Sequence, residues 1–178
     1  MERIRFARWE VSCDPDATRK AYEALEPEVV RSCECFHCRN YRMVAEKAYP
    51  PEFLDLLARL GIDPRKESKL ENSGVRPEEG MHIYDGWYSF VGKVESGTEA
   101  GIGGGLADPE GPVELENYEH EMEPVGERLA VGFSSSSDLV VKSLEFPEPV
   151  AHLVIAALVP WVVELDDDCD LFHRFYGR

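Results

Sequence analysis

The spacing of apolar residues changes from a helical repeat to a strand repeat near residue 70. Within residues 14–64, Phe53, Leu57 and Leu60 follow a 3,4 spacing, and Gly61 then supplies a typical C-terminal stop. After about residue 75, apolar and polar residues alternate with period two, as they do in half-buried strands. An early strand, then helices, then a run of strands is the order expected of an α+β fold.

The predicted fold has an N-terminal strand and two or three helices packed on a mainly antiparallel β-sheet of about five to seven strands. Helices are expected at residues 14–25, 39–49 and 51–60. Strands are expected at residues 3–11, 113–122, 129–133, 139–146 and 150–165, the last with a break or bulge at Pro160. Residues 81–91 are expected to form a hairpin, because Asp85-Gly86 suits the positive φ angles of a type I′ turn.

A chain of 178 residues is most simply one domain, 1–178. Its first part, 1–70, is the strand-plus-helical part that contains the cysteine cluster. Its second part, 75–178, is an acidic antiparallel sheet, since residues 71–178 hold 22 acidic and 6 basic residues and carry the whole net charge of −16. Such a charge argues against nucleic acid or an anionic membrane as a ligand. The leading interpretation is that the charge keeps the protein soluble, and the second is that it forms a surface for a basic protein partner.

The N-terminus has charges at every second residue and no apolar signal segment, so a cytoplasmic location is expected. In that reducing compartment, five cysteines with three crowded into six positions indicate metal or redox chemistry rather than disulfides.

The segment Cys33-Glu34-Cys35-Phe36-His37-Cys38 predicts a zinc site. Zinc prefers four thiolate or imidazole ligands, and a C-x-x-C turn can place two thiolates on one ion. Cys33 would supply a third thiolate, and Cys13 is predicted as the fourth because it closes the first strand. Zinc held by all four would be structural, joining the first strand to the helices.

Three alternatives for the cluster remain open. An open three-thiolate zinc site would suit a metal-dependent enzyme, and an iron–sulfur cluster would use the same ligands. Cys35 and Cys38 at a helix start also have the form of a thiol–disulfide redox pair. Since no other pattern in the chain indicates catalysis, the leading hypothesis is a non-enzymatic binding or interaction protein with a structural zinc.

Several segments resemble a family of uncharacterised bacterial proteins. The resemblance is in Cys33-x-Cys35-x-x-Cys38-Arg39-Asn40-Tyr41, in Leu60-Gly61-Ile62-Asp63-Pro64, in Gly86-Trp87-Tyr88-x-Phe90-Val91-Gly92 and in Pro160-Trp161-Val162. It spans most of the chain and implies a single coherent domain. It brings no activity with it.

Overall fold

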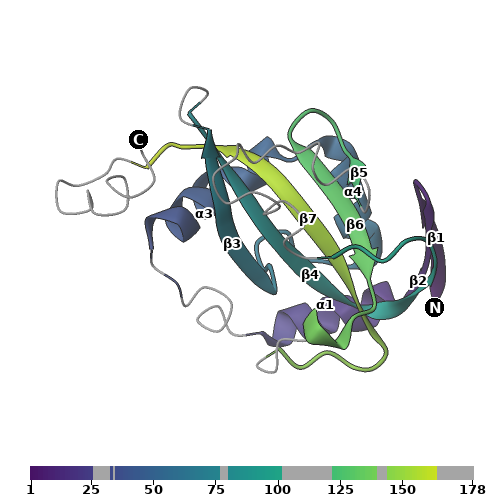
Figure 1. Ribbon diagram of the computed structural model, residues 1–178. Coiled ribbons are helices and arrows are strands. Elements are labelled where there is room, and N and C mark those ends of the chain that lie inside the picture. The colour runs from purple at the N-terminus through teal and green to yellow at the C-terminus, as the bar shows by residue number, and fades with distance from the viewer. Residues whose placement is uncertain (26–32, 34, 77–79, 102–121, 140–143, 164–178) are drawn as a thin grey trace.

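The computed structural model describes residues 1–25, 33, 35–76, 80–101, 122–139 and 144–163 (Figure 1). The described helices are α1 (Pro15–Ala24), α3 (Phe36–Ala48), α4 (Pro51–Leu60) and a short 3-10 helix, η4 (Ser137–Leu139). The strands are β1 (Glu2–Phe6), β2 (Trp9–Cys13), β3 (Lys69–Arg76), β4 (Met81–Ser96), β5 (Glu123–Pro124), β6 (Leu129–Ser134) and β7 (Val150–Pro160). Among these residues no helix has the length and apolar content needed to cross a membrane.

The strands form one seven-stranded sheet in which every pairing is antiparallel. The order is β1-β2-β4-β7-β6-β5, and β3 pairs with β4 outside this path. Strand β4 is long enough to pair with β7 and β3 through its first part and with β2 near its end. This confirms the predicted α+β class and the antiparallel sheet.

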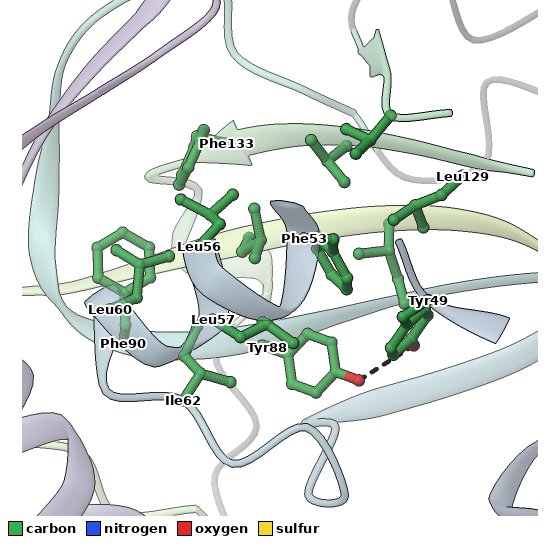
Figure 2. Close-up of a cluster of buried hydrophobic side chains, with 14 of the residues drawn as sticks. Tyr49, Phe53, Leu56, Leu57, Leu60, Ile62, Tyr88, Phe90, Leu129 and Phe133 are labelled. Atoms are coloured by element: carbon green, nitrogen blue, oxygen red, sulfur yellow. Dashed lines mark hydrogen bonds between the residues drawn. The ribbon is translucent and has the colours of Figure 1, made fainter. Parts of the chain in front are cut away.

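The three α-helices cover one face of the sheet, and α4 buries Phe53, Leu56, Leu57 and Leu60 in the core (Figures 1 and 2). Its 3,4-spaced side chains Phe53, Leu57 and Leu60 are at most 1% exposed. The helix ends at Gly61, whose φ of 77° is the left-handed conformation that favours glycine. The apolar stripe seen in the sequence therefore faces the sheet as predicted.

A gap in the sheet along one edge of β4 is filled by side chains of α1 and the loop before β3. The pairing with β3 reaches Trp87, and the pairing with β2 begins at Gly92. In this gap, three side chains bond the backbone of β4: Ser68 Oγ accepts from Ser89 N (3.0 Å), Tyr22 Oη donates to Ser89 O (2.8 Å) and Thr18 Oγ1 accepts from Val91 N (3.0 Å). These backbone groups of β4 therefore have hydrogen-bond partners although no strand pairs with them there.

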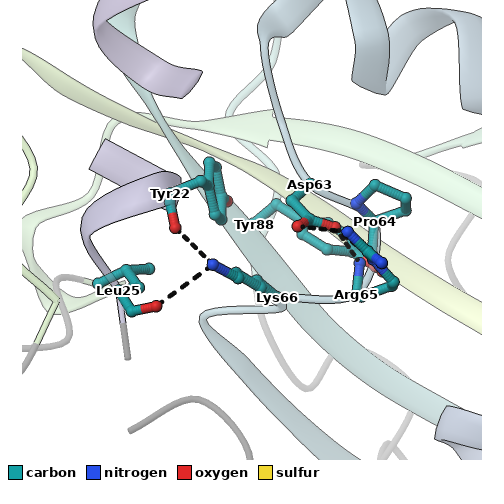
Figure 3. Close-up of polar contacts among 7 residues, drawn as sticks. All are labelled: Tyr22, Leu25, Asp63, Pro64, Arg65, Lys66 and Tyr88. Atoms are coloured by element: carbon teal, nitrogen blue, oxygen red, sulfur yellow. Dashed lines mark hydrogen bonds and ion pairs between the residues drawn. The ribbon is translucent and has the colours of Figure 1, made fainter. Parts of the chain in front are cut away.

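The C-terminal end of α1 is held by the loop that precedes β3 (Figure 3). Lys66 Nζ donates to the carbonyl oxygens of Tyr22 (2.6 Å) and Leu25 (3.2 Å). Both carbonyls belong to the C-terminal end of the helix, where the Tyr22 carbonyl also accepts from the Leu25 amide (3.3 Å). An ammonium at this end suits the helix dipole. Tyr88 Oη donates to Pro64 O at 3.0 Å and fixes the same loop from the sheet side.

Two turn predictions are wrong. Residues 3–11 are not one strand, because the chain reverses between β1 and β2, with Ala7 at a φ of 47°. Residues 81–91 are not a hairpin, because β4 runs straight through Asp85-Gly86 with β3 on one side and β7 on the other. A Cβ on Gly86 would collide with the Lys69 carbonyl, so this glycine allows two strands to approach closely instead of turning one.

Other predictions are confirmed, corrected or lie outside the described residues. Helices α1 and α4 and strand β6 lie close to their predicted positions, with Asp14 as the N-cap of α1, accepting from Ala17 N at 2.9 Å. Helix α3 starts three residues earlier than predicted. Strand β7 ends at Pro160 and does not continue. The predicted strand 113–122 falls almost wholly outside the described residues. The prediction of a strand at 139–146 is wrong where the structure describes it, because Leu139 belongs to η4 and residues 144–146 are not in a strand.

Candidate metal centre

The three clustered cysteines sit where the chain enters α3. Cys35 is the N-cap of the helix, and no side chain caps the helix there. Cys38 is in the first turn, three residues further on, so the two side chains lie on the same side of the helix start. The amide groups of a first helical turn lack intrahelical partners and favour negative charge nearby. This end of α3 therefore suits thiolates.

The sulfur atoms of Cys33, Cys35 and Cys38 all lie within 4.8 Å of one another. Cys33 Sγ lies 3.2 Å from Cys35 Sγ. Cys33 and Cys35 are exposed to solvent, whereas Cys38 is half-buried. A soft ion that binds sulfur at about 2.3 Å can bridge thiolates at these separations. The three thiols are thus close enough to hold a metal ion.

The pKa values of two of the clustered thiols are shifted in opposite directions. The pKa of Cys33 is lowered, first by a hydrogen bond from the Cys35 backbone and then by hydrogen bonds from the other two thiols. The pKa of Cys38 is raised, first by burial and then by its hydrogen bonds with the neighbouring thiols. Cys33 therefore loses its proton more readily than Cys38. A thiophilic cation would have to displace the remaining protons, which makes binding pH-dependent.

Helix α3 is fixed to the sheet directly behind the cluster. The Asn40 side chain is fully buried, and its amide pairs with the chain at and just after the end of β7: Nδ2 donates to Pro160 O (3.0 Å) and Oδ1 accepts from Val162 N (2.7 Å). Tyr84 Oη of β4 donates to His37 O at 3.0 Å. These bonds set the first turn of α3, and with it Cys38, against a rigid sheet.

The approaching chain is also held in place. Arg42 Nη1, one turn after Cys38, donates to Cys33 O at 2.9 Å. This bond draws the exposed Cys33 back toward the helix start and places a guanidinium near the thiols. A cation at this position stabilises ionised sulfur.

An aromatic group borders the cluster. The imidazole of His82 stacks on Trp161 with ring centroids 4.3 Å apart, and the His37 ring lies 5.5 Å from each of them. Neither histidine belongs to the group of ligand atoms that the described residues bring together. Among the described residues, these rings are neighbours of the thiol group and not members of it.

Cys13, the predicted fourth ligand, lies elsewhere. It is fully buried at the end of β2, opposite Gly92 of β4, and is not a member of the thiol group. Burial raises the pKa of Cys13 to about 11, which keeps it a protonated thiol. The structure thus brings together three of the four predicted ligands. The fifth cysteine, Cys169, lies outside the described residues.

Sequence reasoning did not identify the residues that support the cluster, chiefly Asn40, Tyr84 and Arg42. One signal was available, because an asparagine inside a helix competes with the helical backbone unless its amide has a partner elsewhere. Tyr84 and Arg42 gave no comparable signal, since their contacts depend on how α3 docks on the sheet.

Comparisons of the chain with protein-family models, with curated proteins and with solved structures found no match.

Proposed function

We propose that the protein binds zinc through Cys33, Cys35 and Cys38, and acts as a binding or interaction protein and not as an enzyme. The observation that supports this most is the gathering of three thiol sulfurs within 4.8 Å of one another at the start of a helix. Thiolates with a helix N-terminus and a guanidinium beside them form a soft, anionic donor set, which suits zinc among common cellular ions.

The role of the zinc would be local. All three ligands come from six consecutive positions, so the ion would clip the chain onto the start of α3 without joining distant elements. The core formed by α4 and the sheet contains none of these cysteines. Zinc would thus shape an exposed surface, which supports an interaction role over a purely structural one.

The test is zinc binding by the whole protein, measured by elemental analysis after dialysis and by competition with a chromogenic chelator. The wild type should hold one zinc per chain. The triple variant Cys33→Ser, Cys35→Ser, Cys38→Ser should hold none. Cys13→Ala is the matched control, and it should bind zinc like the wild type. Loss of zinc in the control, or its retention in the triple variant, would overturn the proposal.

A second candidate function is thiol–disulfide redox chemistry, favoured by the 3.2 Å separation of Cys33 Sγ and Cys35 Sγ. Oxidation by a disulfide such as oxidised glutathione would form an S–S bond in the protein and release two glutathione thiols. Mass spectrometry of zinc-free protein in a glutathione redox buffer, after alkylation and digestion, decides the matter. A disulfide within the cluster at cytosolic redox poise supports this function, and three alkylated cysteines contradict it.

A further inference from the structure

The thiol cluster provides fewer ligands than zinc takes. Zinc in protein sites is four-coordinate, and structural sites are closed by four protein ligands. Within the part of the chain that the structure describes, the group of potential ligand atoms has three members, all of them sulfur. Cys13, which the sequence suggested as the fourth, is buried in the sheet. The described residues therefore leave one position on the zinc ion open.

The incomplete side of the site faces solvent. Cys33 and Cys35 are both exposed, so another molecule can reach their sulfur atoms. Two large apolar side chains near Asn40 of α3 are exposed as well. Met43 (56% exposed) follows Asn40 by one helical turn, and Val162 (46% exposed) donates its amide to Asn40 Oδ1. Two of the three exposed large apolar side chains among the described residues thus flank Asn40, which is two positions from Cys38.

The charge near the site differs from that of the whole protein. Helix α3 carries Arg39, Arg42 and Lys47 against Glu46, a net charge of +2, in a chain with a net charge of −16. A zinc ion bound to three thiolates is itself an anionic centre. The basic helix would neutralise this anionic centre. Other parts of the protein are strongly acidic and would repel a second copy, but α3 does not carry that acidic charge.

From these observations we infer that a second copy of this chain completes the site, so that zinc joins two copies through their α3 helix starts. This inference rests on the proposed zinc binding. Two copies contribute six thiolates to two zinc ions. If each chain shares one thiolate as a bridge, every zinc has four sulfur ligands. The remaining thiol protons are released to solvent, and Met43 and Val162 become covered.

The experiment measures molar mass by light scattering after size exclusion, together with zinc content, on full-length protein at increasing zinc. The expected result is a zinc-free monomer that becomes a dimer with one zinc per chain and returns to monomer when a chelator is added. Met43→Glu should weaken the dimer at least about tenfold, because it places a charge in an interface that must desolvate it. Ser96→Glu, at the exposed end of β4, is the control and should dimerise normally.

Different failures can be told apart. A monomer that holds one zinc per chain overturns the dimer and leaves the proposed zinc binding intact, with the fourth ligand then coming from the same chain or from water. Protein that takes up no zinc at all overturns both proposals. A dimer of equal strength with and without zinc, or in Met43→Glu, also contradicts the inference.

Discussion

Two sets of polar side chains in this protein have opposite environments. The thiols of Cys33, Cys35 and Cys38 lie within six positions of the sequence and stand mostly exposed. The hydroxyl groups of Thr18 and Tyr22 are buried, and bond a β4 backbone some 70 residues away. The first set contacts its own neighbours in sequence and contributes little to the core. The second set bonds a strand that is distant in sequence and completes the sheet.

This contrast shows what each set is for. Exposed thiols that share protons with one another have no structural need to be there, so their clustering indicates chemistry. Buried hydroxyls that satisfy a backbone edge are part of the fold, because an orphaned backbone amide in the interior costs free energy. Substitutions in the first set should change metal binding and spare stability. Substitutions in the second should do the reverse.

The largest expected effect is on zinc affinity. Cys38→Ser removes a thiolate at the supported, half-buried end of the cluster. Changing even an outer partner of a metal ligand typically costs 10–100-fold in affinity, so loss of the ligand itself should weaken zinc binding by more than about 100-fold. Chelator competition measures this, and the urea unfolding midpoint of the zinc-free protein should be unchanged. Equal zinc affinity in Cys38→Ser would remove that cysteine from the site.

The next effect concerns His152, a buried residue of β7 whose Nδ1 lies 3.1 Å from Ser89 Oγ. Burial lowers its pKa from 6.5 to about 4, although Glu99 opposes the shift. The folded state thus keeps the ring neutral, and between pH 6.5 and 4 the unfolded chain binds more protons. Stability is therefore full above pH 6.5 and should fall by about 3 kcal/mol as the pH drops to 4.

Urea unfolding of the wild type and of His152→Gln at several pH values checks this. The wild type should lose more stability than the variant over that interval, since carboxylates that titrate there are common to both proteins. Parallel curves would show that His152 is not held neutral in the folded state.

A smaller effect is expected at the β4 edge. Thr18→Val keeps the side-chain shape but removes the acceptor for Val91 N, and should lower the free energy of unfolding by about 1–3 kcal/mol. Thr98→Val, at an exposed position, is the matched control and should stay within about 0.5 kcal/mol of the wild type. Zinc affinity should be the same in both variants. A Thr18→Val protein as stable as the control would mean that the edge does not depend on this side chain.

The smallest effect is expected from metal removal. A bound ion stabilises only to the extent that it prefers the folded state, and ligands within six residues remain close together in the unfolded chain. At a protein concentration too low for dimers to form, a chelator should therefore lower the free energy of unfolding by less than about 1 kcal/mol in urea unfolding. Unfolding on metal removal would show instead that zinc holds the whole domain.

Much of the fold could be predicted from short-range pattern. The 3,4 spacing of Phe53, Leu57 and Leu60 and the Asp14-Pro15 start of α1 are local signals, and the structure confirms them. The hairpin predicted at Asp85-Gly86 was wrong, because the sequence does not distinguish a glycine that lets two strands approach closely from a glycine that permits a turn.

The same limit applies to the site. The spacing of Cys33, Cys35 and Cys38 predicted their proximity, since six consecutive positions can place three thiols together. Cys13 was predicted as the fourth ligand because it closes the first strand, but its distance from the cluster depends on tertiary packing, which no local pattern determines. The support from Asn40 likewise depends on contacts more than 100 residues apart. The predicted basic partner and the family resemblance stay predictions.

The central claim is that the three thiols bind zinc, and X-ray absorption at the zinc edge of the loaded full-length protein tests it most directly. The account predicts a first shell dominated by sulfur at about 2.3 Å, with at least three sulfur atoms per zinc. A first shell made only of nitrogen and oxygen at about 2.0–2.1 Å would show that zinc sits elsewhere, and would contradict the account.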